Sequence, residues 1–88
     1  MLTKAEHPVA WAMLMYELTD AREHLGALID LMVAEGAIDE SDFGVQLGHV
    51  FAHLNRAWHG RDDARLDDVP DELHAERSRF LDDLSPVG

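Results

Sequence analysis

The residues of this sequence that could do chemistry are histidines and carboxylates on two neighbouring predicted helices. His49 and His53 are four residues apart, which puts both imidazoles on one face of a helix, about one turn apart. Glu17, Asp20 and His24 follow one line along the preceding helix. If the two helices pack antiparallel, the two lines can meet, and imidazole with carboxylate is a ligand set for a divalent metal ion. These five residues are therefore a candidate metal site, and a divalent metal is the one cofactor that the sequence suggests.

The same five residues have a simpler interpretation. A carboxylate line beside a histidine line also predicts salt bridges and hydrogen bonds between the helices. The chain has neither the HEXXH pattern of metalloproteases nor the Glu-x-x-His pair of di-iron bundles. It also has no cysteine, no glycine-rich phosphate loop and no serine in a nucleophile-elbow context. We therefore assign no catalytic residues and favour a protein without enzymatic activity.

The first of these helices is predicted over residues 8–35 from a continuous apolar stripe with the 3.6-residue period. Pro8 suits a first helical position, and Gly36 suits a left-handed cap at the other end. Thr3 and Glu6 form a capping box, so the chain offers a second helix start. The stripe expected to face the core consists of Ala10, Trp11, Leu14, Leu18, Ala21, Leu25, Leu28, Ile29 and Met32.

The second helix is predicted over residues 40–59. Acidic residues gather at its start, where a helix attracts negative charge, and Gly60 closes it. The connection from Gly36 to Glu40 is so short that the two helices must be antiparallel neighbours. The core-facing stripe of this helix consists of Phe43, Leu47, Val50, Phe51, Leu54 and Trp58.

The rest of the chain predicts a third, shorter helix over residues 70–84, which begins at Pro70. A polar linker at 61–69 precedes it and a tail at 85–88 follows it. The whole chain, 1–88, is expected to form one all-α domain: a long antiparallel helical hairpin with the third helix packed across or beside it.

The first helix is too long for a compact monomer. Its 28 residues make a rod of roughly 42 Å, whereas a compact globule of 88 residues is only about 30 Å across. Either the chain is an elongated hairpin, or a second copy covers the excess. We expect a homodimer in which two hairpins complete a helical bundle. A break of the rod near Gly26 would remove this argument.

A line of small residues on the second helix suggests where another helix could approach. Glycine inside a helix costs up to about 1 kcal/mol relative to alanine, so its recurrence one turn apart favours close packing. The alternative is that Gly44 belongs to a fraying helix start and that Gly48 is merely tolerated. The first helix offers a matching second face. The candidate interface is Met15, Thr19, Gly26, Val33, Gly44, Gly48 and Ala52.

The end of the second helix is the most distinctive stretch in composition. Trp58 is expected to anchor the core with its indole N–H at the rim. Four polar side chains surround it, which predicts either a contact with a partner or simple complementarity of cations with the helix C-terminus. These side chains are Asn55, Arg56, His59 and Arg61.

The net charge of the chain indicates which partners it can bind. The formal net charge is −11 at pH 7, and such a chain repels nucleic acid and anionic membranes. The sequence has no apolar run long enough to span a bilayer and no signal-peptide pattern, so we expect a cytoplasmic protein. The leading hypothesis is a small acidic interaction protein that binds a neutral or basic protein. The alternatives are the metal-binding bundle and an acidic mimic of nucleic acid that uses Asp62, Asp63, Asp67, Asp68 and Asp71.

Overall fold

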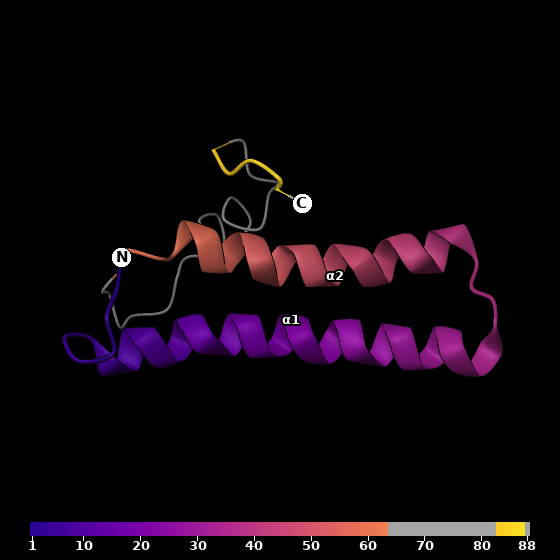
Figure 1. Cartoon of the computed structure of the whole chain (residues 1–88), viewed down its shortest axis with the longest axis horizontal. Helices are drawn as coiled ribbons and strands as arrows, with labels where there is room; N and C mark the ends of the chain where they lie inside the picture. The colour runs from indigo at the N-terminus through magenta and orange to yellow at the C-terminus, as the bar shows by residue number, and fades with distance from the viewer. Residues whose placement is uncertain (64–82, 88) are drawn as a thin grey trace.

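The protein is a two-helix hairpin in the computed structural model, which describes residues 1–63 and 83–87. Helix α1 spans Pro8–Glu35 and helix α2 spans Glu40–His59. The two helices pack antiparallel along their lengths (Figure 1), which confirms the helical fold and the packed pair predicted from the apolar periods. The predicted linker and third helix lie outside the described residues, apart from positions 61–63, 83 and 84; Asp83 and Leu84 are not helical.

Helix α1 is one continuous rod that passes through Gly26 without a break. The molecule is accordingly elongated, with dimensions of 45 × 29 × 24 Å. Of the two alternatives that the length of α1 left open, the chain itself therefore adopts the elongated hairpin.

Local capping residues set the ends of both helices. Pro8 begins α1, and the capping box instead closes a separate short turn, in which the Glu6 amide donates to Thr3 Oγ1 at 3.2 Å. Gly36 ends α1 with φ of 68°, and its amide donates to the Met32 carbonyl at 2.9 Å. Only glycine adopts this left-handed conformation at little steric cost. Asp39 then caps α2 by accepting a 2.8 Å hydrogen bond from the amide of residue 42.

The core is narrow because each helix has one helical neighbour among the described residues. The side chains that α1 and α2 bury against each other are small or medium in size: Ala10, Ala21, Leu28, Val50 and Ala57. The larger members of both predicted stripes are only partly covered. Leu18, Leu25, Phe51 and Leu54 keep between 39% and 41% of their surface exposed, and Ile29 keeps 52%. The predicted stripes therefore face the neighbouring helix, but their larger side chains, including Leu18, Leu25, Phe51 and Leu54, form a partly exposed apolar surface, which we call the open face.

The start of the chain is attached to the end of α2. Leu2 is buried, and its amide donates to the Arg61 carbonyl at 2.8 Å. The Met1 ammonium donates a hydrogen bond to the Asp62 carboxylate, and this bond holds the pKa of Asp62 below its ordinary value. The first residues thereby close one end of the open face.

Neither α1 nor α2 is both long enough and apolar enough to cross a membrane, and no other described segment qualifies.

Candidate functional site

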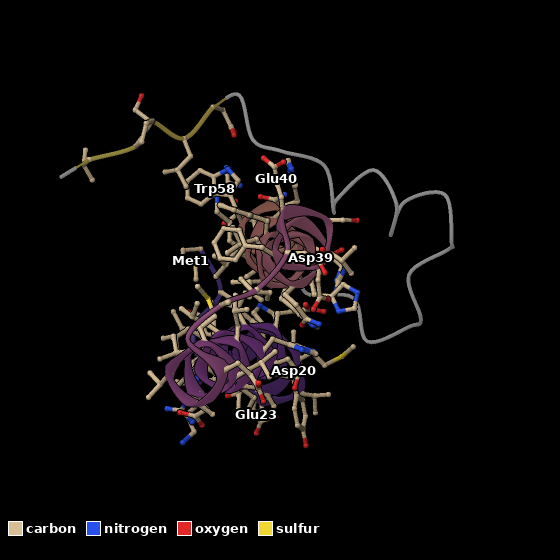
Figure 2. All side chains as sticks on the ribbon, turned by 90° about the vertical axis from the view of Figure 1, so that its right-hand side faces the viewer. Met1, Asp20, Glu23, Asp39, Glu40 and Trp58 are labelled. Carbon is tan, nitrogen blue, oxygen red and sulfur yellow. The ribbon has the colours of Figure 1, made fainter. Side chains whose placement is uncertain are left out.

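The two long flanks of the hairpin differ in chemistry. One flank carries a polar seam, which we define as Glu17 and His24 from α1 with His49, His53 and Arg56 from α2. The other carries an apolar groove. An end-on view of the helices shows Asp20, which lies three residues beyond Glu17 on α1, and Met1, which lines the groove, on opposite sides (Figure 2). The seam contains four of the five predicted metal-site residues, whereas five residues of the predicted core stripes line the groove: Leu14, Leu18, Phe51, Leu54 and Trp58.

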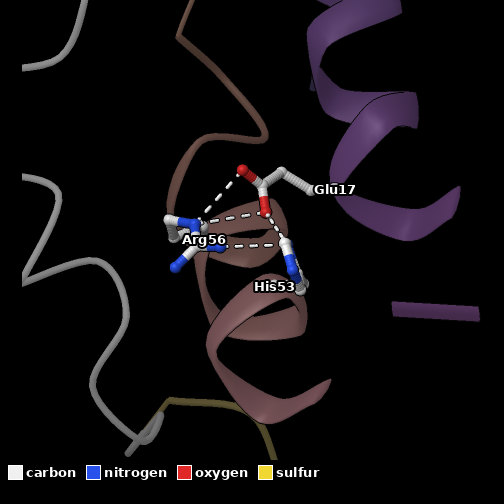
Figure 3. Close-up of polar contacts among 3 residues, drawn as sticks. All are labelled: Glu17, His53 and Arg56. Carbon is white, nitrogen blue, oxygen red and sulfur yellow. Dashed lines mark hydrogen bonds and ion pairs between the residues drawn. The ribbon is translucent and has the colours of Figure 1, made fainter. Parts of the chain in front are cut away.

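Glu17 is the centre of the seam (Figure 3). His53 Nδ1 lies 2.8 Å from Glu17 Oε2, and Arg56 Nε lies 3.1 Å from Oε1 and 3.2 Å from Oε2. The three side chains are largely shielded, with exposed fractions of 27% for Glu17, 16% for His53 and 15% for Arg56. One carboxylate on α1 thus joins two side chains one turn apart on α2. The contact with His53 is of the kind that the simpler interpretation predicted, whereas the contact with Arg56 was not predicted.

The geometry also assigns the proton on His53. Arg56 Nη2 lies 2.9 Å from the same Nδ1 that faces Glu17. Without a proton, Nδ1 could accept from Arg56 but would direct its lone pair at the Glu17 carboxylate. With a proton, it donates to Glu17 and cannot accept from Arg56 Nη2, while Arg56 still reaches the carboxylate through Nε. We therefore place the proton on Nδ1 of His53, an assignment made from the hydrogen-bond network.

The other two histidines extend the seam by ring contacts. The His24 ring stacks on His53, with centroids 5.2 Å apart and planes 20° apart. The His49 ring meets His24 edge-on, at 5.6 Å and 88°. The structure thus brings together Glu17, His24, His49 and His53, and Asp20 is not part of these contacts.

The seam is not arranged as a metal centre. Within residues 1–63 and 83–87, no three histidine, aspartate or glutamate side chains form a group that could hold a metal ion. His53 Nδ1 is directed at Glu17, and two of the imidazoles stack with their planes nearly parallel. Metal binding by these residues stays a prediction from the sequence.

The predicted interface residues differ in exposure. A Cβ atom built on Gly26, Gly44 or Gly48 would meet no atom within 4 Å. Met15 and Val33 are exposed, while Thr19 and Ala52 are half-buried. The described residues therefore leave space beside these three glycines.

The four polar residues near the end of α2 have separate environments. Arg56 belongs to the seam and Asn55 is buried. The Arg61 guanidinium lies 3.8 Å from the centroid of the Trp58 ring and donates to the Trp58 carbonyl at 2.7 Å. His59 is half-buried in the last turn of α2, where a cation complements the helix C-terminus.

The groove is the feature that the sequence did not predict as a site. It encloses about 620 Å³ on the flank opposite the seam. Its walls come from both helices, from Met1 and from the tail segment, which we define as residues 83–87. The side chains that line it are Met1, Leu14, Leu18, Phe51, Leu54, Asn55, Ala57, Trp58, Arg61, Leu84, Ser85 and Pro86. Only Asn55, Arg61 and Ser85 among them have polar side chains, so the groove suits an apolar surface.

No protein family matches the chain, and no curated protein or solved structure is similar to it. The function is therefore argued from the residues of this chain.

Proposed function

We propose that this chain is a small, non-catalytic helical interaction protein that binds through its apolar groove, and that its first partner is a second copy of itself. The groove is the observation that carries the proposal. Large apolar side chains of both helices remain about two-fifths exposed along one flank. Exposed apolar side chains that form one contiguous surface rimmed by polar residues mark sites of protein interaction.

Charge placement makes a second copy a suitable occupant. Each chain carries a net charge of −11, which opposes self-association in general. By the helical period, however, the acidic residues of α1 lie away from Leu14 and Leu18, which line the groove. Two groove flanks can therefore meet in a two-fold arrangement with their acidic faces outward, which completes a four-helix bundle.

The outward faces of such a dimer remain acidic. They repel nucleic acid and favour a neutral or basic protein as the next partner. A cytoplasmic location, as expected from the sequence, fits this role and stays a prediction. Of the acids proposed to mimic nucleic acid, Asp67, Asp68 and Asp71 lie outside the described residues, so this alternative has no observation that favours it over the groove.

Sedimentation velocity with two matched variants tests the proposal. Phe51→Glu places a negative charge in the groove, whereas Tyr16→Glu places the same charge on an exposed apolar residue of α1 outside it. We expect the natural sequence and Tyr16→Glu to dimerise at about tens of micromolar and Phe51→Glu to stay monomeric. Added salt should tighten the dimer, because it screens the repulsion between two acidic chains.

A natural sequence that remains monomeric at these concentrations would contradict the proposed dimer. Dissociation by Tyr16→Glu with no effect of Phe51→Glu would move the interface away from the groove. Thermal melting of both variants at low concentration checks that each still folds.

A further inference from the structure

Part of the same chain covers the Trp58 end of the groove. Leu84, Ser85 and Pro86 of the tail segment line the groove together with Leu14, Leu18 and Trp58. The tail segment runs beside Trp58 in the end-on view (Figure 2). A stretch far along the sequence therefore lies where a partner would bind.

A polar contact fixes this placement. The Trp58 indole Nε1 donates to Asp83 Oδ1 at 2.8 Å, and the Arg61 guanidinium lies 4.0 Å from Asp83 Oδ2. Trp58 and Arg61 are themselves held together, because the guanidinium stacks on the indole ring. The Asp83 carboxylate thus contacts both Trp58 and Arg61 at the end of α2. Leu84, the next residue, lines the groove.

We propose that the tail segment competes with a second copy of the chain for the groove. Its Asp83 accepts a hydrogen bond from Trp58, and its Leu84 packs against the groove. The inference rests on the proposed function, since it assigns regulation to the same groove. A second copy that covers the whole groove has to displace the tail segment. The contact is shallow, because Leu84 remains 49% exposed, so the tail segment can be displaced at moderate cost.

The residues of the tail segment supply a matched pair for the test. Leu84 lines the groove, whereas Val87, three positions on, is 96% exposed and does not line it. Leu84→Ser and Val87→Ser make comparable chemical changes in one segment. Asp83→Ala removes the acceptor of the Trp58 indole. All variants are made in the full chain with Trp11→Phe, which leaves Trp58 as the single tryptophan.

Acrylamide quenching of Trp58 fluorescence and exchange of its indole N–H report whether the tail segment is seated. Loss of one hydrogen bond at this site lowers the closed-to-open ratio about fivefold. We therefore expect Asp83→Ala and Leu84→Ser to increase quenching and speed exchange, and Val87→Ser to change neither. A synthetic peptide Asp-Leu-Ser-Pro-Val, added to Leu84→Ser, should restore protection.

The same variants in sedimentation separate this inference from the proposed dimer. If the tail segment competes, Asp83→Ala and Leu84→Ser should dimerise several-fold more tightly than Val87→Ser. Changed quenching without any dimer supports the seated tail segment and contradicts both the proposed dimer and the competition. Equal quenching in all three variants overturns the inference, whether or not a dimer forms. Equal dimer affinity despite changed quenching overturns the competition.

Discussion

The polar seam and the apolar groove lie on opposite flanks of the same two helices. They differ in how many of their side chains find partners or are covered within the chain. In the seam, Glu17 is reached by both His53 and Arg56, so the polar groups that the helices bring together find partners within the hairpin. In the groove, Leu18, Phe51 and Leu54 remain partly exposed, and Leu84, Ser85 and Pro86 cover only one end.

This difference follows from the reach of the side chains. Long polar side chains can cross the space between two helices and meet in a hydrogen bond at a defined point. Apolar side chains are stabilised only in proportion to the area removed from water, and two helices cannot enclose a continuous stripe on both rods. The seam therefore stabilises the hairpin, while the groove is the flank that a partner could complete.

The largest effect that we expect in the comparison comes from Glu17→Ala. This change leaves His53 and Arg56, both largely shielded, without their shared carboxylate. We expect a loss of about 2 kcal/mol in the free energy of unfolding, below the range for fully buried pairs because the site is partly solvated. Chemical denaturation measures it.

Glu23→Ala is the matched control for Glu17→Ala, since Glu23 is an exposed residue of the same helix, away from α2 (Figure 2). It should change stability by no more than about 0.5 kcal/mol. Equal effects of the two variants would mean that the seam does not hold the helices together.

The groove counterpart, Leu18→Ser, should have a smaller effect that depends on concentration. Leu18 lines the groove and is 41% exposed in the single chain, so its replacement should cost only about 1 kcal/mol in dilute solution. If a second copy covers this flank, the cost should grow as the protein is concentrated, because the variant loses interface as well. Melting temperatures at several concentrations distinguish the two cases, and a difference that stays constant would argue against a groove interface.

The parts of the fold that depend on local signals could be predicted from the sequence. Gly36 and Asp39 end one helix and begin the next through their own backbone and side-chain geometry, so residues 8–35 and 40–59 follow from capping and period. The pairing of Glu17 with His53 was also among the predicted contacts, because both lie at the edge of their apolar stripes.

The degree of burial of each apolar side chain, and the contacts between residues far apart in the sequence, could not be predicted. The apolar period identifies which face of α1 avoids water, but not how many neighbours cover that face, so Leu18, Leu25 and Ile29 were assigned to a core that encloses them only partly. Arg56 was interpreted from its place near the helix end, while its long side chain reaches Glu17 instead. The contact of Asp83 with Trp58 has no periodic signal at all.

The smallest effect on stability that we expect comes from added metal ions. It tests whether the side chains of the seam bind one another and not a metal ion. The sequence places histidines and carboxylates together, but Glu17, His53 and Arg56 already satisfy one another, and the described residues contain no arranged ligand group. Added Zn²⁺ and a chelator should therefore leave the melting temperature the same within about 1 °C. The protein should be purified without a histidine tag, and His24→Gln with His49→Gln serves as the ligand-deficient control. A rise of several degrees with Zn²⁺, reversed by chelator and absent from that control, would instead establish the seam as a metal site whose imidazoles turn from their stacked arrangement to bind the ion.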